Sequence, residues 1–233
     1  MTMVKKFRRV AIFDVDGTVF RSSLFIELVE GLVEKKIFPK YARTIYAEPL
    51  SHWRDRKGSY DDYIEAVVLS FMRYIKGVHY GKLMDVARKI TALHQNRVYR
   101  YTRDLLKELK KRDYYLLAIS QSPKAILDPF CKELGFNKIY GRIYELGPGD
   151  RFTGTILELD KIANKANIVR RAVEKENLTL SGSIAVGDTD GDIPMLELVE
   201  RPICFNPNEK LYRHAKRMGW EVVVERKDVI YKL

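Results

Sequence analysis

The stretch Val10-Ala-Ile-Phe-Asp14-Val-Asp16-Gly-Thr18 stands near the start of the 233-residue chain. Its branched and aromatic residues give way to two acids and a glycine, which is typical of a buried strand that ends in a loop. Because alternate residues of a strand point the same way, Asp14 and Asp16 are expected to face one crevice. The acids either form an Asx-type turn that ends the strand or need a metal or another cation as partner. This stretch alone leaves both interpretations open.

Helices follow this strand before any second strand is indicated. Apolar residues at helical spacing predict three of them: one that Ser22 or Ser23 caps and that stops at Pro39, one over 60–75 and one over 80–96. Ser59 and Asp62 resemble a capping box at the start of the second helix. The weakly patterned residues 40–58 are expected to form a long connection. A strand followed by three helices predicts a small helical subdomain, inserted over residues 21–97.

From residue 98 onward, helices and strands alternate along the chain. Helices are predicted over 98–112, 124–135, 161–176, 193–199 and 210–218. Strands are predicted over 114–119, 183–186, 202–205 and 221–225, with a hairpin or two short strands at 138–144 and 151–157. The expected fold is therefore α/β, a Rossmann-like parallel sheet with helices on both faces. Residues 1–20 and 98–233 would form its discontinuous core domain.

Polar residues recur where the predicted strands end, and such sheets bind ligands outside the carboxyl ends of their strands. Ser120 and Gln121 follow one strand, where hydroxyl and N–H groups either cradle a phosphate or cap a helix. Lys165 is expected near the start of a helix, where a lysine opposes the helix dipole. It is therefore either a solvated surface residue or the partner of an anion.

Three acids follow the strand predicted over 183–186, in the sequence Gly187-Asp-Thr-Asp-Gly-Asp192. Asp188, Asp190 and Asp192 supply the oxygen ligands that a hard cation prefers. The spacing excludes a 12-residue calcium loop, which would end in a glutamate. A cluster of helix-capping acids is the other interpretation.

Composition restricts the class of protein. Hydrophobic residues make up 46% and charged residues 31% of the chain, which indicates a globular protein. Cys131 and Cys204 are too few for a disulfide scaffold or a cysteine-based zinc site. No apolar run approaches the roughly 18 residues of a membrane span, and the basic start carries Asp14 and Asp16 where a secretory signal would be apolar. We therefore expect a cytoplasmic protein that has no membrane partner.

In the order in which they occur, Asp-x-Asp-Gly-Thr, Ser, Lys and Gly-Asp-x-x-x-Asp resemble the motifs of the haloacid dehalogenase (HAD) superfamily of phosphohydrolases, over nearly the whole chain. The helical insertion looks like the family's helical cap domain. The segments Arg151-Phe-Thr-Gly154 and Phe205-Asn-Pro-Asn208 look like the phosphoserine-phosphatase-like subclass, subfamily IB. The resemblance implies a phosphatase that uses Mg²⁺ and hydrolyses a small phosphomonoester through an aspartyl-phosphate.

The same resemblance implies roles for the acids. Asp14 would be the nucleophile, and Asp16 would protonate the leaving group and then accept a proton from water. The carboxylate of Asp14, the backbone carbonyl of Asp16 and the carboxylate of Asp188 would hold Mg²⁺, with Asp192 supporting the site from close by.

The remaining motif residues would bind the substrate. The resemblance implies that Lys165 and Ser120 stabilise the charge on the transferring phosphoryl oxygens, with Thr18 and the N–H of Gln121 as lesser contributors. Phosphoserine phosphatases carry a glutamate that faces the substrate amine, and Ser23 stands at that position here. A partner for a substrate amine is therefore not evident from the sequence, and another phosphomonoester fits better. Arg21 could bind a second anionic group or be solvated.

Other functions stay open beside this one. The chain could be a phosphoserine phosphatase proper, a phosphoryl-transferase of the same fold, or a basic binding protein without turnover; the intact set of acids and lysine counts against the last. The net charge of +11 suits nucleic acid, an anionic membrane surface or a phosphorylated substrate. Because the excess is spread over the insertion and the core, we interpret it as a basic envelope that attracts phosphorylated anions, without a nucleic-acid partner. The oligomeric state is not evident.

Overall fold

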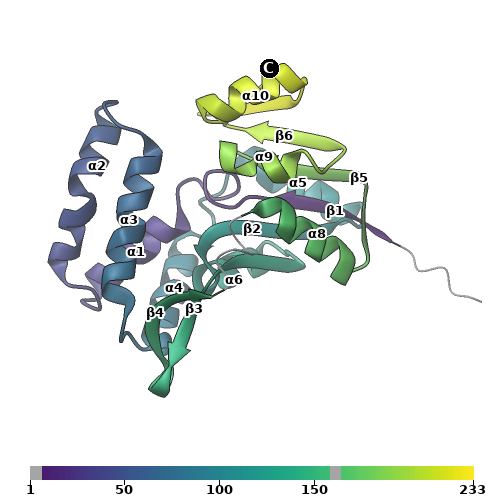
Figure 1. Cartoon of the computed structure of the whole chain (residues 1–233). Coiled ribbons are helices and arrows are strands. Elements are labelled where there is room, and N and C mark those ends of the chain that lie inside the picture. The colour runs from purple at the N-terminus through teal and green to yellow at the C-terminus, as the bar shows by residue number, and fades with distance from the viewer. Residues whose placement is uncertain (1–6, 158–163) are drawn as a thin grey trace, which may run out of the picture.

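A mostly parallel sheet organises the computed structural model, which describes residues 7–157 and 164–233 (Figure 1). The strand order is β4-β3-β2-β1-β5-β6-β7-β8. The strands are β1 (Arg8–Phe13), β2 (Tyr115–Pro123), β3 (Lys138–Gly147), β4 (Arg151–Leu157), β5 (Leu178–Gly187), β6 (Arg201–Phe205), β7 (Glu221–Arg226) and β8 (Val229–Lys232). Neighbouring strands pair in parallel, except that β4 and β8 are antiparallel to β3 and β7. The predicted sheet and hairpin are confirmed, whereas β8 was not predicted.

The first strand lies in the middle of the sheet, between β2 and β5. Phe13, its last residue, pairs with Ala118 of β2 on one side and with Val186 of β5 on the other. The strand order changes direction at this point, and open α/β sheets bind ligands at such a switch point. The ends of β1, β2 and β5 therefore bring Asp14, Ser120 and Asp188 to the same edge.

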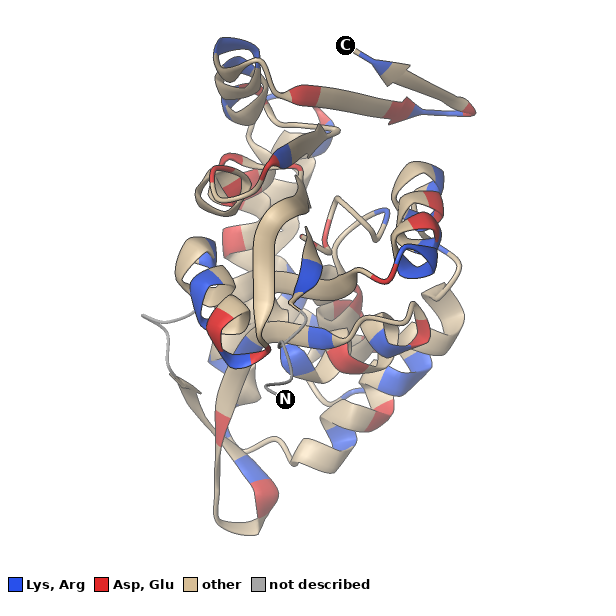
Figure 2. Ribbon diagram, turned by 90° about the vertical axis from the view of Figure 1, so that its right-hand side faces the viewer, with Lys and Arg blue, Asp and Glu red and all other residues tan. Residues whose placement is uncertain are grey.

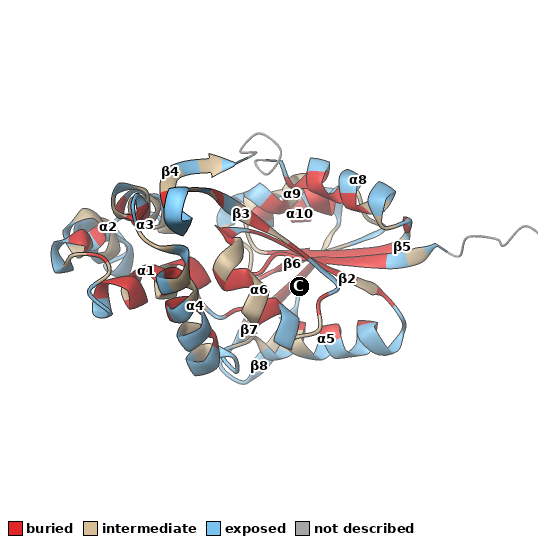
Figure 3. Cartoon of the chain, turned by 90° about the horizontal axis from the view of Figure 1, so that it is seen from below, coloured by how far each residue is buried: buried red, intermediate tan, exposed pale blue. Residues whose placement is uncertain are grey.

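Helices cover both faces of the sheet, and buried residues concentrate in the strands between them (Figure 3). The helices α5 (Arg100–Lys111) and α6 (Lys124–Glu133) pack on the face that receives Phe13. The helices α8 (Lys165–Lys175), α9 (Ile193–Leu196) and α10 (Glu209–Met218) pack on the face that receives Ile12. Of the helix predicted over 161–176, residues 161–163 lie outside the described part of the chain. No helix within the described ranges is long and apolar enough to cross a membrane.

The insertion between β1 and α5 is helical and lies beside the carboxyl edge of the sheet (Figure 1). It consists of α1 (Leu24–Glu34), the short 3-10 helix η1 (Lys40–Arg43), α2 (Thr44–Arg54), α3 (Tyr60–Ile75) and α4 (Tyr80–His94). The expected connection over 40–58 is therefore wrong, because residues 40–54 are helical. Tyr46 is the one buried residue of α2, and Pro49 lies inside the helix. Its sequence thus lacks the apolar stripe by which a helix is predicted.

Polar side chains fix where two of these helices begin. The hydroxyl of Ser23 accepts hydrogen bonds from the N–H groups of Phe25 and Ile26 at the start of α1. Ser59 and Asp62 form a reciprocal capping box at the start of α3. Both predicted caps are confirmed, and a cap of this kind contributes about 1 kcal/mol to stability.

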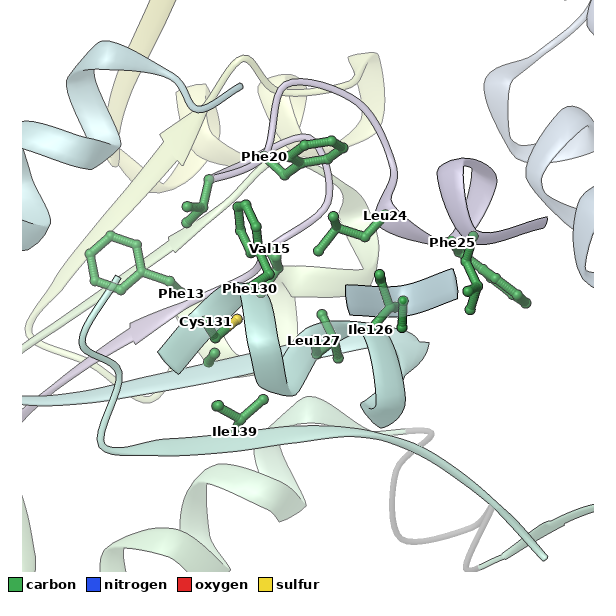
Figure 4. Packing of buried hydrophobic residues seen from close by; sticks show 14 of the residues in the cluster. Phe13, Val15, Phe20, Leu24, Phe25, Ile126, Leu127, Phe130, Cys131 and Ile139 are labelled. Carbon is green, nitrogen blue, oxygen red and sulfur yellow. The ribbon is translucent and has the colours of Figure 1, made fainter. Parts of the chain in front are cut away.

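One hydrophobic cluster joins the insertion to the sheet (Figure 4). The ring of Phe20 packs edge-on against Phe130 of α6, with centroids 5.4 Å apart, and Phe25 of α1 packs against Phe71 of α3 at 5.0 Å. Leu24 lies between them and is fully buried. Burial of each such side chain contributes about 1.5–3 kcal/mol. Packing therefore fixes the position of α1 and α3 relative to β1.

Candidate active site

A cavity of about 470 Å³ opens at the carboxyl ends of β1, β2 and β5. Asp14 directly follows β1, and its N–H donates a hydrogen bond to the carbonyl of Val186 in β5 at 2.9 Å. The sequence-predicted site residues that line the cavity are Asp14, Asp16, Ser120, Gln121, Lys165 and Asp188. Thr18 and Asp192 are fully buried and do not line it. All of the predicted residues nevertheless meet at one edge of the sheet.

Lys165 joins two buried carboxylates. Its Nζ atom donates to Oδ1 of Asp14 and to Oδ1 of Asp192, each at 2.5 Å. Lys165 is the first residue of α8 and is only 6% exposed. A buried ammonium group is stable only with such partners. The interpretation of Lys165 as a solvated surface residue is therefore wrong.

The carboxylate of Asp192 is held on both oxygens. Its Oδ2 atom accepts from the N–H groups of Asp188 and Thr189 at 3.0 Å each, while Oδ1 accepts from Lys165. This carboxylate therefore shapes the turn after β5 and orients the lysine. Both of its oxygens are occupied by protein donors.

Asp188 lies close to Asp14, and one oxygen each of Asp14, Asp188 and Asp192 lie within 4.8 Å of one another. The hydroxyl of Thr18 donates to Oδ1 of Asp188 at 3.1 Å. Because Thr18 is fully buried, its hydroxyl reaches Asp188 and not the open cavity. It orients the carboxylate of Asp188 from behind.

The charges of this cluster are unbalanced. Burial raises the pKa of Asp14 and of Asp188 well above the ordinary aspartate value; neighbouring carboxylates raise both further, and Lys165 opposes the shift. Burial works to lower the pKa of Lys165, but Asp14 and Asp192 outweigh it and raise that pKa, so the lysine stays charged. Three carboxylates and one ammonium leave two negative charges without a partner. This set of oxygen donors fits a divalent cation such as Mg²⁺.

Asp16 turns away from this cluster toward β2. Its Oδ2 atom accepts from the hydroxyls of Ser120 at 2.6 Å and Ser122 at 2.8 Å. Its Oδ1 atom accepts from the N–H of Leu24 at 2.6 Å. The hydroxyl of Ser120 is thus bonded to Asp16, and Asp16 ties the end of β1 to the start of α1.

Gln121 is exposed, and its side-chain oxygen accepts from the guanidinium of Arg142, at 2.5 Å from Nη2 and 3.1 Å from Nε. Arg142 belongs to β3 and lines the cavity. It makes no ion pair with a described carboxylate, so it brings an uncompensated positive charge. Sequence reasoning missed Arg142 because the hairpin in which it lies carries no motif.

Helix α3 closes the cavity on the side opposite the sheet. Tyr60, Ile64 and Val68 recur every four residues and line the cavity, as do Asp61 and Glu65. The helical spacing that predicts this helix treats Tyr60, Ile64 and Val68 as part of a single apolar stripe with the buried residues. The fully buried side of the helix consists instead of Tyr63, Val67, Phe71 and Ile75. Asp61 and Glu65, four residues apart beside the apolar stripe, could have indicated from the sequence that a second side of this helix faces a polar cavity.

The phenol of Tyr60 faces the acids from this helix. Burial raises the pKa of Tyr60, and the charges of Asp16 and Asp188 raise it further. The ring packs against Trp53 with centroids 5.2 Å apart. The phenol therefore keeps its proton and can donate a hydrogen bond into the cavity.

A second loop supports the acids that follow β5. Asn208 donates from its backbone N–H to the carbonyl of Asp188 and from its side chain to Asp190, both at 2.8 Å. The hydrogen bond from the side chain of Asn208 and the nearby Lys210 lower the pKa of Asp190, so Asp190 stays charged. The sequence Phe205-Asn-Pro-Asn208 thus serves to hold the acidic turn. Arg21 is exposed, lies 5.5 Å from the ring of Tyr99 and does not line the cavity.

Gly17 is expected to be essential for the position of Asp188. It has φ +80°, and a Cβ atom there would lie 2.1 Å from Oδ2 of Asp188. The Gly17→Ala variant should therefore displace that carboxylate and lower turnover by at least about a hundredfold. Gly149→Ala is the matched control, because Gly149 also has positive φ (+64°) but has no atom within 4 Å of the added Cβ. Equal turnover by the two variants, measured under the same conditions, would contradict this role of Gly17.

Curated relatives resemble this chain over most of its length. The phosphoserine phosphatase SerB1 of Mycobacterium tuberculosis is 26% identical over 216 residues, which are 91% of this chain and 69% of that protein. The histidinol-phosphatase of Neisseria meningitidis is 24% identical over 224 residues, which are 93% of this chain and 98% of that protein.

A solved structure and a family model agree with these relatives. A phospho-aspartyl intermediate analogue of phosphoserine phosphatase has the same fold, with a TM-score of 0.61 and 18% identity over 96% of each chain. Residues 11–197 match the model of the haloacid dehalogenase-like hydrolases. That range contains the second half of β1, the whole helical insertion and the acidic turn after β5. The chain therefore belongs to the haloacid dehalogenase-like hydrolases, and within that family it is similar to the phosphoserine-phosphatase-like members.

Proposed function

We propose that this hydrolase is a Mg²⁺-dependent phosphatase that acts on a small phosphomonoester through an aspartyl-phosphate on Asp14. The observation that carries the proposal is the setting of that carboxylate. Lys165 holds Oδ1 of Asp14 at 2.5 Å, while Oδ2 accepts no hydrogen bond from the described residues and the side chain lines the cavity. The free oxygen is placed to attack phosphorus.

The acids divide the chemistry between two steps. Oδ2 of Asp14 attacks the phosphorus as the bond to the leaving oxygen breaks, and Asp16 donates a proton to that oxygen. Water then attacks the phosphorus of the aspartyl-phosphate and gives its proton to Asp16, which releases phosphate and restores Asp14. The hydrogen bonds from Ser122 and Leu24 hold the side chain of Asp16 at the wall of the cavity.

The remaining site residues position charge. Asp14, the backbone carbonyl of Asp16 and Asp188 would hold Mg²⁺, which supplies positive charge to the phosphoryl oxygens when bound. Asp192 and Thr18 support this set by holding Lys165 and Asp188. In this proposal Thr18 acts through Asp188 and does not contact the substrate, in place of the phosphate-binding role expected from the sequence.

Phosphoryl oxygens would be bound from two sides. Lys165 and the N–H of Gln121 approach from the sheet, and the hydroxyl of Ser120, which donates to Asp16 in this structure, would join them by turning to the substrate. Residues 21–97 act as a cap domain over the core formed by 1–20 and 98–233. In this division the phenol of Tyr60 faces the phosphate from the cap.

The wall formed by α3 favours a leaving group that carries an ammonium group. Asp61 and Glu65 face a cavity that must already admit a phosphate dianion, and neither acid has a basic partner among the described residues. Two unpaired carboxylates repel a further anion and attract a cation. They supply the partner for an amine that Ser23 does not, because the hydroxyl of Ser23 caps α1. The names of the two relatives, phosphoserine and histidinol phosphatase, agree with an amino-alcohol phosphate.

Release of phosphate from a panel of esters tests these proposals. We expect turnover of p-nitrophenyl phosphate with Mg²⁺, its loss in EDTA and its return when Mg²⁺ is added back. Phosphoethanolamine, phosphoserine and histidinol phosphate should give a higher kcat/KM than glucose 6-phosphate. Turnover that does not depend on metal would contradict the mechanism, and a preference for the sugar phosphate would contradict the role of Asp61 and Glu65. Transfer of phosphate to added alcohols, in place of water, would identify a phosphoryl-transferase.

A further inference from the structure

A second hollow, of about 810 Å³, lies where the cap meets the β3–β4 hairpin. We call it the basic hollow; its lining includes Lys35, Lys36, Tyr41, Tyr74, Lys76, His79, Lys82 and Arg151. These residues come from the segment after α1 and from η1, from the end of α3, the connection that follows it and the first turn of α4, and from the start of β4. The basic hollow and the catalytic cavity share no lining residue.

The charge of the basic hollow is of one sign. Four lysines and one arginine line it, and no aspartate or glutamate does. Within the described part of the chain, none of these lysines forms an ion pair, in contrast to Lys124, Lys138 and Lys165. Figure 2 shows that basic and acidic residues are otherwise mixed along most helices. Five like charges around one hollow repel each other unless an anion binds among them.

Two of the lysines occupy positions that favour other residue types. Lys36 follows the end of α1 with φ 57°, the left-handed conformation in which glycine is usual. Lys82 lies in the first turn of α4, where acids are favourable and a lysine opposes the helix dipole. An anion bound beside Lys82 would offset the unfavourable interaction between this lysine and the helix dipole. The local sequence therefore does not account for this concentration of lysine.

Backbone contacts hold the walls of the basic hollow in place. The N–H of Gly77 donates to the carbonyl of Phe152 at 2.8 Å, and the guanidinium of Arg151 donates to the carbonyl of Gly77 at 2.7 Å. The Nδ1 atom of His79 accepts from the N–H of Gly81 at 3.0 Å. In the neutral ring Nε2 therefore carries the proton and can donate.

An aromatic wall accompanies the charge. Tyr41 is 64% exposed, and its ring meets Tyr74 edge-on with centroids 5.9 Å apart. The volume of the hollow falls within the roughly 300–1,000 Å³ typical of sites for small molecules. Lysines together with an exposed aromatic ring suit a phosphate chain attached to a base. We propose that the basic hollow binds a nucleoside di- or triphosphate, with its phosphates among the lysines and its base on Tyr41.

Calorimetric titration of the whole chain with ATP in EDTA tests the proposal. The hollow variant Lys36→Gln/Lys76→Gln/Lys82→Gln is expected to weaken binding at least about tenfold. The control variant Lys107→Gln/Lys111→Gln/Lys216→Gln loses the same charge from exposed lysines elsewhere, and it should change binding by less than about twofold. Both variants should keep their turnover of p-nitrophenyl phosphate, so this test is independent of the proposed phosphatase function.

Further ligands distinguish the source of the phosphate chain. Tyr41→Leu should weaken the binding of ATP but not of tripolyphosphate, and equal weakening would contradict recognition of a base. The proposal would be overturned by equal effects of the two triple variants, by no measurable binding of ATP, or by tighter binding of a single-stranded oligonucleotide than of ATP.

Discussion

The phosphatase turnover of the Asp14→Asn variant is expected to be at least about a thousandfold lower than that of the wild type, while the variant keeps the fold. The amide has nearly the shape of the carboxylate, but it cannot form an acyl phosphate. The substitution also removes a charge that is costly in the folded chain. Burial raises the pKa of Asp14, and the charges of Asp192 and Asp16 raise it further, while Lys165 opposes the shift. The free energy of unfolding in EDTA should therefore stay the same or increase. Phosphate release with Mg²⁺ and urea unfolding without it measure the two effects.

A matched substitution separates chemistry from charge. Asp113→Asn makes the same change at an exposed acid that pairs with Arg8 at 2.9 Å. A surface pair of this kind contributes only about 0–1 kcal/mol, so turnover should be retained. After incubation with a radioactively labelled ester and an acid quench, the wild-type chain should carry label and the Asp14→Asn variant none. Labelling of that variant, or Mg²⁺-dependent turnover close to that of the wild type, would place the nucleophile elsewhere.

The acids at the strand ends were predictable because their positions follow from local rules. A strand directs alternate side chains to one face, and parallel strands of an α/β sheet end at one edge. Asp14, Ser120 and Asp188 therefore meet without any knowledge of tertiary packing. The direction of each side chain was not predictable. Asp16 turns to Ser120 and Ser122 because these hydroxyls lie on the neighbouring strand.

The far side of the cavity could not be predicted, because it depends on how the helical insertion packs. Packing of Phe20 on Phe130 and of Phe25 on Phe71 sets the rotation of α1 and α3. The helical period of the sequence shows on which side of α3 Glu65 lies. Only the rotation of the helix, which packing sets, determines that this side faces the cavity. Lys165 posed a related difficulty. A lysine at a helix start is ambiguous until the two acids that surround it, 151 and 27 residues away in the chain, are placed.

The Lys165→Met variant is expected to lose about 3–5 kcal/mol of unfolding free energy in EDTA at neutral pH, because two buried carboxylates then lack their cation. Its turnover should fall at least about a hundredfold, since a charge that stabilises the phosphoryl group is lost. Lys138→Met is the control, because Lys138 is largely exposed and pairs with Glu176 at 3.2 Å. That control should lose less than about 1 kcal/mol.

The loss of stability in Lys165→Met should depend on pH in a defined direction. The pKa of Asp14 is raised by burial in the folded chain above its ordinary value of 3.8, and Lys165 is the group that opposes this shift. An acid with a raised folded pKa contributes stability that is present below the ordinary pKa and is lost as the pH rises through the folded value. Without Lys165 the folded pKa rises further, so the deficit relative to wild type should grow as the pH rises above the ordinary value of 3.8 toward neutrality.

Combination of the two substitutions tests whether the lysine and the acid act as a pair. Asp14→Asn in the Lys165→Met background removes one of the two stranded carboxylates, so it should restore part of the lost unfolding free energy and flatten the pH dependence. Asp113→Asn in the same Lys165→Met background is the matched control, and it should restore none of the lost unfolding free energy. A deficit that is independent of pH, or additive in the double variant, would mean that Lys165 acts through packing of its aliphatic chain. Coupling would instead show that this ammonium group is what allows a buried nucleophile to remain ionised beside three other acids.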